Sequence, residues 1–296
     1  MKDKVLILGG SGMLGWQVVS VLSKIYPNIS VTASNMKSSK NLKKKINKRL
    51  NIIRFNALNF NKSNLKKIIL KHKIIVNCIG LIKPHINEYD SNDVIKAIKI
   101  NSELPNILSD MAKKSKIKIY QIATDCVFSG KSKLYKENTK HDCEDVYGKT
   151  KSLGEVHSKN FYNIRCSIIG EEIKNHKSLI SWFLSNPDGS KVNGFTNHEW
   201  NGVTTNAFAE ILKTIIKNQI KLPNLIHIVP KNRVSKFKLL KILNKKYNKN
   251  LKVKKFLSSV SINRTLATNN KKLNIEIWNK SKFRSIPTIE KMIEEI

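Results

Sequence analysis

The sequence predicts an α/β fold in which a doubly wound parallel sheet is joined to a smaller, mostly C-terminal α/β domain. Three observations predict it. Short apolar runs, of the kind that form buried parallel strands, alternate with segments of helical apolar spacing as far as Gly170. A glycine-rich segment at residues 9–15 separates the first apolar run from the first helical segment. Beyond Gly170 the alternation loosens, which indicates a second unit.

The expected sheet comes from the first 170 residues. Each predicted strand is an apolar or alternating segment bounded by polar residues or glycine, and each predicted helix has apolar residues three and four positions apart. Pro105 interrupts the longest helical segment, because proline has no amide hydrogen to donate. The predicted strands are residues 4–10, 29–34, 50–57, 73–80, 116–124 and 161–170, and the predicted helices are residues 13–26, 61–72, 92–114 and 146–159.

The last third of the chain mixes short elements. Residues 187–205 are rich in turn formers and polar aromatic residues. The apolar run at residues 225–230 predicts a strand that returns to the sheet, and the C-terminal segments predict a lid. Helices are expected at residues 176–185, 206–218, 236–248 and 288–296.

The formal net charge is +34, with 55 basic and 21 acidic residues. Such a charge can indicate a nucleic-acid or anionic-surface binder. However, only six basic residues are arginine, and lysine, asparagine and isoleucine, which A/T-rich codons encode, are all abundant. Codon bias therefore explains the charge better, and no nucleic-acid partner is expected. The charge should still attract anionic cofactors and substrates.

Other features argue against a secreted, membrane or metal-binding protein. The four cysteines form no C-x-x-C pair, so we expect free thiols and no metal site. The sequence contains no run of eighteen apolar residues, so no membrane span is predicted. The N-terminal apolar run ends in glycines and not in a cleavage site, so a cytoplasmic location is expected.

A phosphate-binding turn is predicted between the first strand and the first helix. Gly9, Gly12 and Gly15 have G-x-x-G-x-x-G spacing, with Met13 and Leu14 inside it. Glycine is needed here because the turn is tight and the backbone must approach a pyrophosphate closely. The position of this motif between a strand and an amphipathic helix predicts a bound dinucleotide.

The end of the second strand should select the dinucleotide. An acidic residue there would bind the ribose 2′-hydroxyl of NAD, but the segment "TASNMKSSK" has none. Ser34 and Lys37, or Lys40 in place of Lys37, are expected to hold a 2′-phosphate, which favours NADPH over NADH. We therefore expect an NADP(H)-binding Rossmann domain at residues 1–168, to which residues 203–230 return. Residues 169–202 and 231–296 are expected to form a substrate-binding domain.

The segment "YGKTK" places Lys151 four residues after Tyr147, on one face of a predicted helix. In a chain so rich in lysine, one such pair is expected by chance. Its position gives it weight, because it follows the fifth strand, 23 residues after Thr124, in a chain that opens with a phosphate-binding turn. A nearby ammonium group would stabilise a phenolate, so the pair is a candidate for proton transfer.

Over nearly its whole length the chain resembles the extended short-chain dehydrogenase/reductase superfamily, and within it the dTDP-4-dehydrorhamnose reductase family. The resemblance implies that Thr124, Tyr147 and Lys151 form a catalytic triad that reduces the 4-keto group of a nucleotide-linked 4-keto-6-deoxyhexose in surface-polysaccharide synthesis. The motifs that carry it, in order, are "GGSGMLG", "NCIG", "INSELP", "TDCVFSG", "YGKTKSLGE", "NIRCSIIG", "NGVTT" and "NRTL".

The resemblance also assigns other cofactor positions. Asn56 and Ala57 correspond to the adenine site, where the superfamily usually has an acidic residue. Cys78, Ile79 and Gly80 correspond to the segment under the cofactor ribose and phosphates. Tyr147 and Lys151 are implied to contact the cofactor in addition to their catalytic role.

On the substrate side, Thr124 and Asp125 are implied to meet the sugar. Asn197, His198 and Trp200 are expected to bind sugar hydroxyls or stack on a ring, although a structural loop with a buried tryptophan explains the same pattern. Arg264 resembles the position that meets the nucleotide diphosphate, the alternative being a surface arginine. The list of substrate candidates is therefore Thr124, Asp125, Asn197, His198, Trp200 and Arg264.

Cys126 separates some of the possible activities. Related dehydratases have Thr-Asp-Glu where this chain has Thr-Asp-Cys, and a thiol cannot replace a carboxylic acid in protonating a leaving hydroxyl. A reductase is therefore favoured, and an epimerase or an amino-sugar-nucleotide reductase remains open. A non-catalytic regulatory subunit, like that of methionine adenosyltransferase, is a further alternative. The expected partners are a nucleotide-sugar substrate and a second copy in a homodimer, and no membrane.

Overall fold

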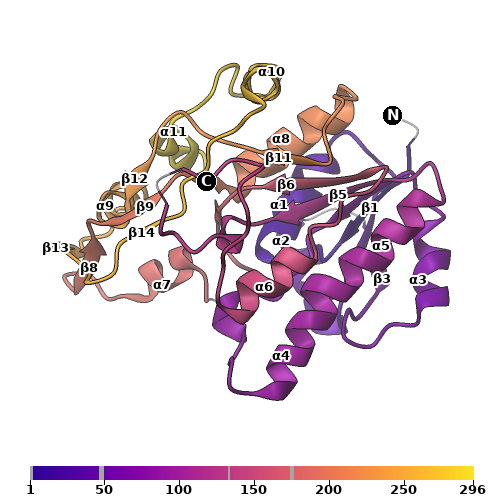
Figure 1. Ribbon diagram of the computed structural model, residues 1–296, viewed down its shortest axis with the longest axis horizontal. Coiled ribbons are helices and arrows are strands. Elements are labelled where there is room, and N and C mark those ends of the chain that lie inside the picture. Colours follow the sequence, from indigo (N-terminus) through magenta and orange to yellow (C-terminus); the bar gives the residue numbers. More distant parts are fainter. Residues whose placement is uncertain (1–2, 47–49, 133, 174–176) are drawn as a thin grey trace.

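The computed structural model describes residues 3–46, 50–132, 134–173 and 177–296. A seven-stranded parallel sheet lies at its centre (Figure 1). The strands are β1 (Val5–Leu8), β2 (Ser30–Ala33), β3 (Asn51–Arg54), β4 (Ile74–Asn77), β5 (Lys118–Ala123), β6 (Phe161–Arg165) and β11 (Leu225–His227). Their order is β11-β6-β5-β4-β1-β2-β3, which confirms the predicted doubly wound class.

Helices cover both faces of the sheet. On β1, Val5 and Ile7 join one apolar cluster and Leu6 and Leu8 join another, because successive side chains of a strand point to opposite faces. The first cluster contains residues of α1 (Met13–Leu22), α2 (Met36–Ile46) and α8 (Thr205–Lys217), and the second contains residues of α3 (Lys62–Ile69) and α5 (Leu104–Lys113). The inner strands of the sheet are thus buried between two helical layers, whereas the edge strand β3 is partly exposed.

The helical segment predicted at residues 92–114 is interrupted, as expected, just before Pro105. It consists of α4 (Ser91–Ile98), a π-helical turn η2 (Lys99–Glu103) and α5, with Pro105 in the first turn of α5. Proline is tolerated in a first turn, where its missing amide would have no partner in the helix.

Helix α2 is a difference from the sequence-based expectation, which placed no helix there. Only Ser38 and Leu42 of α2 are buried, so the apolar pattern that predicts a helix is nearly absent. The Asn35 side chain caps this helix by accepting a hydrogen bond from the Ser38 amide at 2.9 Å.

Two predicted elements of the sheet region are shorter than expected. Helix α6 (Val146–Leu153) ends at Gly154, where a Cβ atom would lie 1.9 Å from the Asn101 carbonyl oxygen, so only glycine fits against η2. The strand predicted at residues 161–170 is split into β6 and β7 (Ile168–Ile169), and β7 pairs with β10 (Val203–Thr204).

The rest of the chain forms a second lobe at one side of the sheet (Figure 1). The turn-rich segment at residues 187–205 contributes strands to it, which the sequence did not predict. Its helices are α7 (Leu179–Ser185), α9 (Lys236–Tyr247), α10 (Lys271–Lys280) and α11 (Ile289–Glu294), and its strands are β8 (Lys191–Phe195), β9 (His198–Trp200), β12 (Val234–Ser235), β13 (Lys252–Phe256) and β14 (Ile262–Asn263). Residue 176 of the helix predicted at 176–185 lies outside the described residues.

The strand predicted at residues 225–230 is present as β11, which pairs with β6 at the edge of the main sheet. One apolar cluster runs from α1 and α8 into α9, α10 and α11, so both lobes share a core. In the part of the chain that the structure describes, no helix has the length and apolar character that a membrane span requires.

Candidate functional site

A cavity of about 1010 Å³ follows the carboxyl ends of the central strands. In doubly wound sheets this edge is where ligands bind, at the point where the strand order reverses, here between β1 and β4. Most of the predicted site residues line this cavity. They are Gly9, Gly12, Met13, Leu14, Ser34, Asn56, Ala57, Cys78, Ile79, Gly80, Thr124, Asp125, Tyr147 and Lys151.

The glycine-rich turn has the geometry that a pyrophosphate site needs. Gly9 has a φ of +78°, which strongly favours glycine, and its amide donates to Thr32 Oγ1 at 2.9 Å. Gly12 begins α1 without a side-chain cap, which leaves backbone amides available to an anion. Gly15 does not line the cavity. A Cβ atom there would lie 2.1 Å from the Gly9 carbonyl oxygen, so Gly15 allows α1 to pack against the turn.

The edge formed by β2 and β3 differs in part from the sequence-based expectation. Ser34 lines the cavity, as does Asn35, but Lys37 lies on α2 with its side chain exposed and outside the lining. Arg54, at the end of β3, does line the cavity and was missed. Arg54 is identified as a cavity residue by the pairing of β2 with β3, which cannot be read from the sequence alone.

Thr124, Tyr147 and Lys151 line the same part of the cavity. Thr124 directly follows β5, and Tyr147 and Lys151 lie one turn apart on α6. The Asp145 side chain caps α6 by accepting a hydrogen bond from the Gly148 amide at 2.7 Å, which fixes the start of the helix. Lys151 is 7% exposed, and its Nζ donates to the Ile122 carbonyl oxygen at 2.9 Å.

Burial dominates the electrostatics of the Tyr147–Lys151 pair. It raises the pKa of Tyr147, which a hydrogen bond with Thr124 opposes in part. It also lowers the pKa of Lys151, which the carboxylate of Glu155 opposes. The sequence-based expectation was a phenol whose pKa is lowered by the ammonium group together with the cationic nicotinamide of a bound cofactor. In the structure the phenol is held in its protonated form, which suits a group that donates a proton.

Asp125 connects the cavity to charged residues of the second lobe. It begins the 3₁₀ turn η3 (Asp125–Val127) and is buried, which raises its pKa, whereas Arg264 and Lys236 oppose that rise. Arg264 does not line the cavity, and its Nε donates to the Phe128 carbonyl oxygen at 2.7 Å. Lys236, the first residue of α9, was missed because nothing distinguishes it among the lysines of that segment.

The other predicted substrate residues lie outside the cavity lining. Asn197 bonds through its side chain to the backbone of Ser258, and His198 Nε2 contacts the Val260 carbonyl oxygen at 3.0 Å. Trp200 is buried, and its Nε1 donates to Ser167 Oγ at 2.9 Å. These side chains hold the second lobe together in the structure, and their contacts with a substrate stay a prediction.

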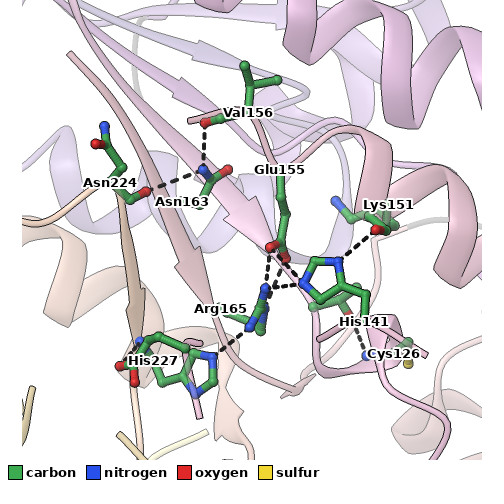
Figure 2. A network of polar contacts seen from close by, with 12 residues as sticks. Cys126, His141, Lys151, Glu155, Val156, Asn163, Arg165, Asn224 and His227 are labelled. Carbon is green, nitrogen blue, oxygen red and sulfur yellow. Dashed lines mark hydrogen bonds and ion pairs between the residues drawn. The ribbon is translucent and has the colours of Figure 1, made fainter. Parts of the chain in front are cut away.

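Behind α6 lies a buried polar network centred on Arg165 (Figure 2). The Arg165 side chain is 0% exposed and donates from Nε and Nη2 to the Glu155 carboxylate. It also contacts two ring nitrogens, His141 Nε2 at 2.7 Å and His227 Nε2 at 2.8 Å. Glu155 lies one turn beyond Lys151, so this network supports the helix that carries the candidate catalytic residues.

His227 is held neutral in this network. Its Nδ1 donates to the Ala267 carbonyl oxygen at 2.7 Å, which leaves Nε2 to accept from Arg165. Burial, together with the charge of Arg165, lowers the pKa of His227 from 6.5 to about 4. The imidazole of His227 therefore takes up no second proton near neutral pH.

This pKa predicts a loss of stability in mild acid. The unfolded chain takes up a proton at His227 below about pH 6.5 and the folded chain does so only near pH 4, so stability falls across that window. At pH 5 the His227 contribution is a loss of about 2 kcal/mol. Urea unfolding at pH 7.5 and pH 5 measures it. His227→Gln should flatten this dependence, whereas the same change at exposed His157 should keep it; equal pH dependence in both variants would contradict the prediction.

The sheet order and the cavity at the strand ends define an α/β protein of the doubly wound class, in which ligands bind at this edge of the sheet. The chain belongs to the RmlD substrate binding domain family, whose profile matches residues 2–295. This confirms the family resemblance that the sequence motifs predicted. A search of curated proteins found no match to the sequence.

Solved structures share the fold at low identity. One is the dTDP-4-dehydrorhamnose reductase of Bacillus anthracis in complex with NADP, with 18% identity and a TM-score of 0.72 over 100% of this chain and 98% of that one. The enzyme of the same name from Yersinia enterocolitica has 17% identity and a TM-score of 0.72 over 99% and 98%. The UDP-glucuronic acid 4-epimerase of Bacillus cereus, with UDP-glucuronic acid and NAD, has 15% identity and a TM-score of 0.74 over 98% and 96%.

Proposed function

We propose that this protein is an NADPH-dependent reductase of the 4-keto group of a nucleotide-linked 4-keto-6-deoxyhexose. One observation carries the proposal: Thr124, Tyr147 and Lys151 line the same cavity as the glycine-rich turn. A dinucleotide laid along the strand ends from Gly12 would bring its reactive ring toward these three side chains. Membership of the RmlD family and the NADP complex of the Bacillus anthracis reductase support this choice.

The residues of the cavity fit such a cofactor. Gly9 and Gly12 line the cavity, and Gly12 has no side chain to block the approach of a pyrophosphate to the start of α1. Asn56 accepts a hydrogen bond from the Leu58 amide at 3.0 Å through Oδ1, which orients its amide group at the proposed adenine end. Cys78 and Gly80 form the floor between the two ends. When bound, NADPH supplies the hydride that the reduction requires.

The side chains of this chain supply the rest of the chemistry. The protonated Tyr147 donates its proton to the carbonyl oxygen as negative charge develops on it. Thr124 Oγ1 is positioned to hydrogen-bond that oxygen, and the Lys151 ammonium group places positive charge beside the phenolate that Tyr147 becomes. Asp125, next to Thr124, orients the sugar.

Cys126 supports a reductase over a dehydratase. Burial, together with the neighbouring Asp125 carboxylate, raises the pKa of Cys126 to about 12, so the thiol stays neutral. Neither a thiol nor a thiolate replaces the carboxylic acid that eliminates water from a sugar. An epimerase is the second candidate, because the Bacillus cereus 4-epimerase has a similar fold and the same triad types would serve both reactions.

The test is net oxidation of NADPH with a panel of dTDP-, UDP- and GDP-linked 4-keto-6-deoxy sugars. A reductase consumes one NADPH per sugar reduced, which the loss of NADPH absorbance measures. An epimerase recycles its cofactor and converts the sugar without net consumption. No sugar conversion with any member of the panel would contradict catalysis and favour the regulatory-subunit alternative. The cytoplasmic location and a homodimer stay predictions.

A further inference from the structure

We propose that Arg54 binds the 2′-phosphate of NADPH and so sets the preference of this protein for NADPH over NADH. This inference rests on the proposed function and replaces Lys37 in the role first expected of it. It gives the dinucleotide preference to a residue on β3, a strand in which the sequence-based argument sought no phosphate ligand.

The pairing of β2 with β3 places Arg54 at the required edge. Ala33 and Arg54 are register partners in these parallel strands, and the Phe55 amide donates to the Ala33 carbonyl oxygen at 3.0 Å. Ser34 directly follows Ala33, so Ser34 and Arg54 both lie where the two strands end. Both line the cavity.

The Arg54 guanidinium group is free to bind an anion. Its side chain is exposed and makes no hydrogen bond or ion pair with any residue in the ranges that the structure describes. No acidic residue occurs in residues 30–35 or 51–58 to compete for it. A dianionic phosphate is the partner that suits a planar guanidinium group best, because two parallel N–H groups can bind two phosphate oxygens.

Neighbouring side chains complete a site for a phosphate ester. The Ser34 hydroxyl can donate a hydrogen bond to a phosphate oxygen. Asn35 contacts Ser34 through Nδ2 at 3.5 Å and caps α2 through Oδ1, so its position at the mouth of the site is fixed. The Lys37 side chain, by contrast, is exposed on α2 and does not line the cavity.

A different role for Arg54 is to stack on the adenine ring, since guanidinium groups also stack on aromatic faces. The two roles differ in what they recognise. Stacking would stabilise NADPH and NADH equally, because both contain adenine. Phosphate binding stabilises only the cofactor that carries the 2′-phosphate, so the ratio of the two affinities separates the roles.

The experiment measures dissociation constants for NADPH and NADH by cofactor fluorescence in the wild type, Arg54→Ala and Lys37→Ala. Arg54→Ala should weaken NADPH binding by about tenfold to a hundredfold, as expected for lost charge-assisted hydrogen bonds, and change NADH binding by less than about twofold. Lys37→Ala removes another exposed cation, on α2, and should change neither by more than about twofold. Competition by 2′,5′-ADP should weaken in Arg54→Ala, while competition by 5′-AMP should not. An unchanged melting temperature shows that each variant is folded.

Three results would overturn the inference: equal weakening of both cofactors, weakening in Lys37→Ala in place of Arg54→Ala, or no NADPH preference in the wild type. Its failure is distinguishable from failure of the proposed function. A protein that binds NADPH through Arg54 yet reduces no sugar would sustain the inference and contradict the reductase. A wild type that binds neither dinucleotide would contradict both.

Discussion

Replacing Tyr147 by phenylalanine should lower kcat by about a hundredfold to ten-thousandfold, while the dissociation constant of NADPH changes by less than about threefold. The change removes only the hydroxyl group that is proposed to protonate the carbonyl oxygen. The phenylalanine ring should occupy the same place as the tyrosine ring, because the backbone of α6 positions this residue. Steady-state rates with the reducible sugar and a fluorescence titration measure the two quantities.

The matched control is Tyr162→Phe. Tyr162 lies on β6, stacks on Tyr120 with ring centroids 5.5 Å apart, and does not line the cavity. Its replacement should leave kcat within about twofold of the wild type. If Tyr147→Phe kept more than a tenth of the wild-type rate, Tyr147 would not be the proton donor.

The pKa of Tyr147 adds a second readout. Since burial raises this pKa, the phenol should stay protonated throughout the usual assay range, and the reduction rate should show no decline from its ionisation up to about pH 10. Loss of rate with a midpoint near neutral pH that disappears in Tyr147→Phe would show that the bound cofactor and Lys151 lower this pKa further than burial raises it.

Arg165→Met should cost about 3–5 kcal/mol of stability, because it leaves the Glu155 carboxylate buried without its cation. Glu155 has a side-chain exposure of only 3%, so water cannot replace the lost partner. Methionine retains most of the length of the arginine side chain. The loss of stability is therefore due more to the unpaired Glu155 carboxylate than to an unfilled cavity. Urea unfolding at pH 7.5 measures it.

Two further variants test the cause. Glu155→Leu together with Arg165→Met removes both charges and should recover a large part of the lost stability, since the unpaired carboxylate is gone. Lys280→Met breaks an exposed pair with Glu276 and should cost less than about 1 kcal/mol. If the double variant were as unstable as Arg165→Met, lost packing and not unpaired charge would explain the effect.

The sheet was predictable because its signals are local. The buried runs of β1 and β4 are bounded within a few residues by glycine or polar residues, and Gly9 and Gly12 follow β1 directly. Helix α2 lacks such a signal, because it buries almost no apolar surface and is instead started by the Asn35 cap. Sequence periodicity reports burial, so a helix with little burial escapes it.

The site was predictable where one segment carries the chemistry, and not where two segments meet. Tyr147 and Lys151 are neighbours on one helix, so their spacing places them together. Arg54 becomes a site residue only through its pairing with Ala33 on another strand. For Asn197 and Trp200 the same polar groups suit a sugar or a neighbouring backbone, and the structure bonds them within the protein. Residue type alone does not distinguish the two uses.

The packing of α8 against α1 has a consequence for biosynthesis. These helices are in contact but about 190 residues apart in the chain. At ribosomal rates of about 5–20 residues per second, the apolar face of α1 waits roughly 10–40 s before α8 emerges to cover it. The residues of α1 that contact α8 in the finished protein lack this cover during that interval. The nascent chain is therefore most vulnerable to aggregation while its N-terminal half is already made, and a chaperone that binds apolar helical faces should engage it there.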